Sequence, residues 1–155
     1  MADEHILVDG YSILHQWPEF RPLLRKSLAA ARQALIHLMT QFQDCRGGKI
    51  TVVFDGRSIP RGGDGIRTQV QIIYSKDGQT ADAVIERLVG QSAHPQQFLV
   101  ATDDYAEQNL VESCGAHSLS ADGFHALVQA ELDSLDKALE GLALRNQSFG
   151  RRRSN

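Results

Sequence analysis

Residues 6–9 are ILVD, three apolar residues followed by an aspartate, and two later segments repeat that arrangement. They are VVFD at 52–55 and LVATDD at 99–104. Short apolar runs of this kind are typical of buried strands. The carboxyl ends of parallel strands lie at one edge of a sheet, so we expect these aspartates to lie near one another. Ligands bind at that edge.

Strand and helix signals alternate along the rest of the chain. The strand candidates are the apolar runs at 6–8, 50–54, 70–74, 98–101 and 116–119. Apolar residues at helical spacing predict four helices: one that opens at Pro22 and buries a stripe from Leu24 to Phe42, one over 81–89 capped by Thr80, one over 105–114, and one over 121–144. This alternation predicts an α/β fold, a three-layer α/β/α sandwich with a mainly parallel central sheet.

The predicted last helix carries the most regular apolar stripe. Its members are Phe124, Val128, Leu132, Leu135, Leu139 and Leu142, spaced by three or four residues. Such a stripe needs a partner, and we expect it to pack on the sheet. We therefore predict one domain over residues 1–145, followed by a basic, flexible tail over 146–155 that contains three consecutive arginines.

The composition is that of one globular domain. The chain has 155 residues, 42% hydrophobic and 23% charged. No apolar run reaches the roughly 18 residues that span a bilayer, and the N-terminal residues MADEHILVDG lack the basic flank of a signal peptide. Cys45 and Cys114 make neither a disulfide framework nor a zinc site. We expect a cytoplasmic protein with no membrane partner.

The net charge of −3 is unevenly distributed. Residues 56–76 carry Arg57, Arg61, Arg67 and Lys76 against a single aspartate, a local charge of +3. Residues 77–144 carry twelve acidic residues against two basic ones, a local charge of −10. A basic loop beside an acidic region is one way to bind a phosphate through both cations and a bound metal. Solvated faces of opposite sign explain the pattern equally well.

Carboxylates from four segments are predicted to meet at the sheet edge: Asp9, Asp55, Asp82 in the first turn of a helix, and the pair Asp103 and Asp104. Clustered carboxylates repel one another unless a cation lies among them. Oxygen ligands without a pattern of Cys or His favour Mg²⁺ or Mn²⁺. Taken singly, Asp104 could instead cap a helix and Asp82 could complement a helix dipole. Trp17 fits a loop anchor better than a surface on which a base stacks.

The quoted segments together resemble a known family. VDGYSILHQWPEF begins at residue 8, VVFDG at 52, IIYSKDGQTADAVIERL at 72 and VATDDYAEQ at 100. In this order they resemble the YacP-like NYN-domain family of PIN-like nucleases, whose best-known members are ribosome-associated endoribonucleases that cut messenger RNA. The resemblance covers residues 5–132 and implies a PIN-like parallel sheet with an acidic metal site.

The resemblance also implies roles for single residues. It places the family's aspartates on Asp9, Asp55, Asp82 and Asp104, and the family's lysine on Lys76. Asp103 stands where the family has serine, which leaves open which of the two adjacent acids turns inward. Ser12 stands where the family usually has asparagine, so the orientation of Asp9 or of a water molecule depends on a shorter side chain.

Two functions from different classes follow. The first is a Mg²⁺- or Mn²⁺-dependent endoribonuclease acting on messenger RNA, with the ribosome as a further partner. In it Asp9, Asp82 and Asp104 bind the metal, Asp55 supports them, and Lys76 with Arg57, Arg61 and Arg67 positions the RNA backbone. The second is an RNA- or ribosome-binding module that has kept the fold and lost catalysis, for which Ser12 is the one sequence hint. A phosphoacceptor domain fits less well, because its paired acids should follow the first strand.

Overall fold

A computed structural model of the chain describes residues 4–56, 69–76 and 78–153, with side chains as far as Gln147. Five parallel strands form the central sheet in the order β3-β2-β1-β4-β5. The strands are β1 (His5–Asp9), β2 (Lys49–Phe54), β3 (Gln71–Tyr74), β4 (Phe98–Ala101) and β5 (His117–Leu119). The predicted α/β class and the sheet are confirmed, and every pairing is parallel.

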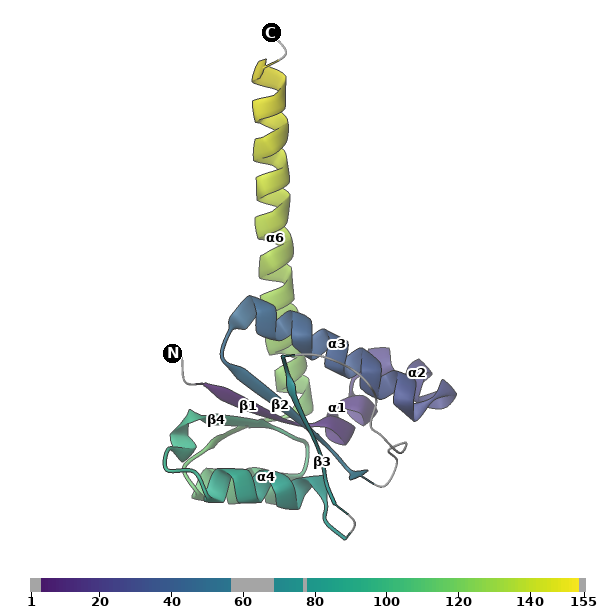
Figure 1. Cartoon of the computed structure of the whole chain (residues 1–155), viewed down its shortest axis with the longest axis vertical. Coiled ribbons are helices and arrows are strands. Elements are labelled where there is room, and N and C mark those ends of the chain that lie inside the picture. Colours follow the sequence, from purple (N-terminus) through teal and green to yellow (C-terminus); the bar gives the residue numbers. More distant parts are fainter. Residues whose placement is uncertain (1–3, 57–68, 77, 154–155) are drawn as a thin grey trace.

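Helices cover both faces of this sheet (Figure 1). They are α1 (Gly10–Gln16), α2 (Arg21–Lys26), α3 (Leu28–Arg46), α4 (Ala81–Gly90), α5 (Tyr105–Ser113) and α6 (Ala121–Arg153), with short 3-10 turns η1 (Pro18–Phe20) and η3 (Pro95–Gln97). Alternate residues of β1 point to opposite sides of the sheet. Ile6 and Val8 join the core beneath α1, α3 and α6, whereas Leu7 joins the core beneath α4 and α5.

The N-terminal helical region differs from the predicted single helix. The helix is interrupted at Ser27, whose extended backbone separates α2 from α3. Its hydroxyl accepts a hydrogen bond of 3.2 Å from the Ala30 amide and so caps α3. A serine that caps a helix stops the preceding one, because capping requires non-helical backbone angles.

The short helix α1 was not predicted. It begins directly after β1, and Gly10 makes its close approach to the sheet possible. A Cβ atom on Gly10 would lie 2.3 Å from the Phe54 ring, which is fully buried. Trp17, just after this helix, is also fully buried and donates a hydrogen bond of 2.8 Å to the Ala121 carbonyl. Trp17 is therefore the predicted loop anchor, and burial removes it as a surface for stacking a base.

The last helix is longer than predicted and packs differently. α6 continues to Arg153, through most of the segment expected to be a tail, and extends away from the other elements (Figure 1). Phe124 and Val128 are fully buried, but Leu139 and Leu142 are 54% and 52% exposed. The expectation that the whole stripe packs on the sheet is thus wrong, because the sheet ends before the helix does. No helix in the described part of the chain is both long and apolar enough to cross a membrane.

Candidate functional site

Three carboxylates from three elements meet at the carboxyl edge of the sheet. Asp9 is the last residue of β1, Asp82 lies in the first turn of α4, and Glu107 lies in the first turn of α5. One oxygen atom from each lies within 4.8 Å of the other two. Asp9 is 6% exposed and Glu107 is 1% exposed, so the cluster is recessed. The structure brings Asp9 and Asp82 together and places Glu107 beside them.

Two hydroxyl groups hold the cluster in place. Ser12 donates a hydrogen bond of 3.0 Å to Oδ2 of Asp9. Thr102, fully buried at the end of β4, lies 2.9 Å from Oε2 of Glu107 and 3.3 Å from Oδ2 of Asp9. The Thr102 hydroxyl has one proton, which it donates to Glu107 in the shorter of these two contacts. The hydroxyl oxygen also accepts a hydrogen bond of 3.1 Å from the Asp104 amide. Ser12 therefore orients Asp9 even though it is shorter than asparagine.

Mutual repulsion and burial perturb these acids. Burial first, then the nearby carboxyl groups of Asp82 and Asp9, raise the pKa of Glu107 to about 9. Burial is also the main reason that the pKa of Asp82 is raised to about 6, with Asp104 and Asp9 adding to the effect. Groups with such pKa values are typical of functional sites. The site holds protons that a cation would displace.

Asp104 and its neighbour Asp103 point in different directions. Asp104 caps α5, since its Oδ1 accepts from the amides of Ala106 and Glu107 at 3.0 and 3.3 Å. Its carboxyl group also interacts with that of Asp82, which together with these amides holds the pKa of Asp104 below its ordinary value. Asp103 turns away and accepts a hydrogen bond of 2.8 Å from the Ala121 amide at the start of α6. Asp104 is exposed, caps α5, and is the one of the pair whose carboxyl group interacts with Asp82.

The other predicted site residues lie around this centre or outside the described chain. Asp55 follows β2 and is half-buried, but it is not a member of the three-carboxylate group. Lys76 is exposed in the turn that follows β3. Arg57, Arg61 and Arg67 lie outside the described residues.

Glu107 and Thr102 are two residues of the site that were not predicted from the sequence. Glu107 had been counted only among the acidic residues of its region. A signal was present: Glu107 follows the cap Asp104 by three residues and precedes the buried Val111 by four, so it lies on the inward face of the helix. Thr102 had no comparable signal, because a threonine after a strand is common in any sheet.

Sheet, covering helices and recessed acids together define an α/β domain of the nuclease type. Residues 6–153 match the YacP-like NYN domain, and the chain belongs to that family. It is 36% identical over 119 residues to YacP of Bacillus subtilis (strain 168), covering 75% of this chain and 69% of that protein. The crystal structure of Rae1 (YacP) from Bacillus subtilis has a TM-score of 0.78 at 29% identity over 94% of this chain and 84% of that chain. A mutant of Rae1 gives a TM-score of 0.77 at 30% identity, over 90% and 83% of the two chains.

Proposed function

We propose that this chain is a divalent-metal-dependent endoribonuclease that cleaves phosphodiester bonds of messenger RNA in the cytoplasm, in association with the ribosome. The observation that carries the proposal is the recessed group formed by Asp9, Asp82 and Glu107 in a family of nuclease-type domains. Three mutually repelling carboxylates at a ligand-binding edge destabilise the fold unless they serve a cation.

The donor set fits a hard divalent cation. All three side chains offer oxygen, which Mg²⁺ and Mn²⁺ prefer. Oε1 of Glu107 is buried and accepts no hydrogen bond from the described residues, so it is available to a cation once the carboxyl group loses its proton. When bound, such a cation supplies Lewis-acid stabilisation of a phosphate oxygen and lowers the pKa of a water molecule. Asp9, Asp82 and Glu107 would hold it, with Asp104 beside Asp82 as a further ligand.

The chain's other residues would position the RNA. Ser12 and Thr102 keep the acids in a single orientation, which a reacting phosphodiester requires. Lys76 is exposed and could contact the RNA backbone, and Arg57, Arg61 and Arg67 would extend that basic surface. Asp55, half-buried at the same edge, would support the site electrostatically.

The alternative is an RNA- or ribosome-binding module that lacks catalysis. Ser12 suggested this reading, since the family usually has asparagine there. Its hydrogen bond to Asp9 favours the nuclease instead, because the orienting contact is present.

A cleavage assay separates the two functions. A labelled messenger RNA is incubated with the full chain in Mn²⁺, Mg²⁺ or EDTA, with and without ribosomes, beside Asp9→Asn and Asp82→Asn. Asp133→Asn, an exposed acid on α6, is the matched control. We expect metal-dependent cutting that the two site variants abolish and the control keeps. A wild type that binds RNA or ribosomes but never cuts would establish the binding module.

A further inference from the structure

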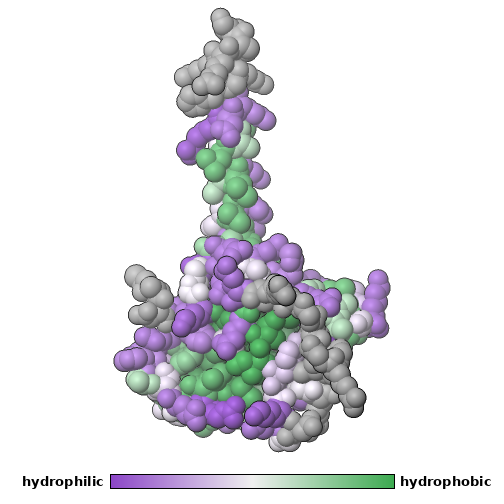
Figure 2. Space-filling model, viewed as in Figure 1, coloured by the Kyte–Doolittle hydropathy of each residue, from purple (hydrophilic) through white to green (hydrophobic). Residues whose placement is uncertain are grey.

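The exposed half of α6 has the pattern of a helix that pairs with another helix. Leu132, Leu135, Leu139 and Leu142 are spaced by three, four and three residues, the spacing of a coiled-coil seam. Leu135 is 41% exposed, and the next two seam residues are more exposed still. Figure 2 shows hydrophobic surface along the projecting part of the helix. An exposed apolar stripe of this length marks an interaction site.

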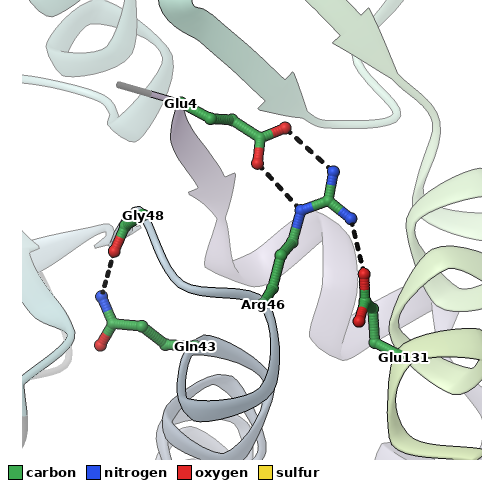
Figure 3. Close-up of polar contacts among 5 residues, drawn as sticks. All are labelled: Glu4, Gln43, Arg46, Gly48 and Glu131. Atoms are coloured by element: carbon green, nitrogen blue, oxygen red, sulfur yellow. Dashed lines mark hydrogen bonds and ion pairs between the residues drawn. The ribbon is translucent and has the colours of Figure 1, made fainter. Parts of the chain in front are cut away.

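The base of the projecting helix is held firmly to the body. Arg46 at the end of α3 donates to Glu4 at 2.9 and 3.1 Å and to Glu131 of α6 at 3.0 Å (Figure 3). Gln43 donates to the Gly48 carbonyl beside it, at 3.2 Å. The Arg46–Glu131 ion pair joins α6 to α3, and through Arg46 to Glu4, where the helix leaves the body.

A groove of about 420 Å³ lies at this base, between α3 and α6. It is lined by Gln41, Asp44, Cys45, Leu132, Leu135 and Asp136, so it is continuous with the leucine seam and carries two acids. Burial, together with the carboxylates of Glu131, Asp44 and Asp136, raises the pKa of the Cys45 thiol. The groove is therefore an apolar surface in a negative environment.

The charge of α6 changes sign along its length. Residues 131–140 contain four acidic residues and Lys137, a charge of −3. Residues 141–153 contain four arginines and no acid, a charge of +4. Two such helices placed side by side in opposite directions match acid with base, whereas the same direction sets like charges against each other.

We propose that α6 pairs antiparallel with α6 of a second copy of this chain, in the register that sets Leu139 of each helix opposite Leu142 of the other and Asp136 opposite Arg145. The basic end of each helix then lies over the acidic groove at the base of the other. A second copy accounts for both the leucine seam and the reversal of charge. RNA bound by the arginines would account for the charge alone.

Sedimentation of the full chain over a micromolar concentration series tests the pairing. We expect a dimer whose dissociation constant rises at least about tenfold in Leu139→Asp and in Leu142→Asp, since a buried charge opposes pairing. Leu144→Asp is the control: it lies on the same helix, is 66% exposed and is off the seam, so it should leave the dimer intact. Circular dichroism of each variant separates lost pairing from lost helix. A wild type that is monomeric throughout the series would overturn the proposal.

Charge reversal tests the direction of pairing. One variant carries Asp136→Arg and another carries Arg145→Glu. Each substitution alone should weaken the dimer, and both in one chain should restore it, because opposite charges face each other again in the antiparallel arrangement. Failure of the combined chain to recover would rule out this arrangement. A monomer that binds RNA through the arginines of α6 would overturn the pairing itself.

Discussion

The hydroxyl of Thr102 lies 2.9 Å from Oε2 of Glu107 and ties the end of β4 to the first turn of α5. It is shorter than the contacts that Ser12 and Thr102 make with Asp9, at 3.0 and 3.3 Å. The same oxygen receives the Asp104 amide, so one side chain sets the position of two acids. Residues that orient ligands in this way affect metal affinity and activity without touching the substrate.

Replacing Thr102 by valine keeps the shape and removes the hydroxyl. We expect cleavage to fall about 10- to 100-fold, because Glu107 and the Asp104 amide each lose a partner. The free energy of unfolding should fall by about 1–3 kcal/mol. Thr102→Ser is the matched control and should keep most of the cleavage activity and most of the stability, because it keeps the hydroxyl group. Cleavage rates and chemical unfolding check the result, and a fully active valine variant would contradict it.

Replacing Glu107 by glutamine should change how stability depends on pH. The pKa of Glu107 is about 9 in the folded chain against an ordinary value of 4.5, so the native state keeps a proton that the unfolded state releases. The contribution of Glu107 to stability is then greatest below about pH 4.5 and is lost as the pH rises towards 9. Glutamine cannot ionise, so we expect the variant to be more stable than the wild type at pH 8 in EDTA, by a few kcal/mol at about 1.4 kcal/mol per pKa unit.

Urea unfolding at pH 5 and pH 8 measures this difference. Glu140→Gln, an exposed acid on α6, should follow the wild type at both values. Saturating Mn²⁺ should raise the free energy of unfolding of the wild type at pH 8. It should not raise that of Glu107→Gln, because this variant has lost one of the metal ligands. Parallel pH curves for wild type and Glu107→Gln would show that Glu107 is ionised in the fold and refute the prediction.

The adjacent acids Asp103 and Asp104 should give opposite results when each becomes asparagine. Both variants keep an oxygen that can accept the capping amides, so stability should change little. Asp104→Asn removes the charge beside Asp82, and we expect cleavage to fall at least about tenfold. Asp103→Asn should stay active. Thermal unfolding and RNA cleavage are measured for both variants. If Asp103→Asn lost activity and Asp104→Asn kept it, Asp103 would be the acid that acts at the site.

Replacing Gly10 by alanine should destabilise the fold. The added Cβ would meet the buried Phe54 ring at 2.3 Å, and the ring is fully enclosed. Overpacking of this kind costs about 1–3 kcal/mol. Gly90→Ala is the control, since a Cβ there meets no atom within 4 Å. Thermal unfolding should show a lower midpoint for the first variant only. An unchanged midpoint for Gly10→Ala would mean that α1 shifts freely on the sheet.

The sheet and part of the site could be predicted because their signals are local. Each strand is a short apolar run, and Asp9 directly follows one of them. Parallel pairing then brings strand ends to one edge, which is how Asp9 and Asp82 could be expected to meet. Asp55 follows the same rule yet stays outside the three-carboxylate group, because position along an edge does not fix where a side chain points.

The partners of Asp9 depended on tertiary structure. Thr102 and Glu107 lie 93 and 98 positions away in the sequence, and only the packing of α5 against the sheet brings them in. The same holds for α6, whose apolar stripe is uniform in the sequence but buried at Phe124 and exposed at Leu139. By itself the sequence determined which segments are apolar and where acids follow them. Three-dimensional packing decided which acids share one recess and how far the body covers the last helix, because burial depends on neighbours that are distant along the chain.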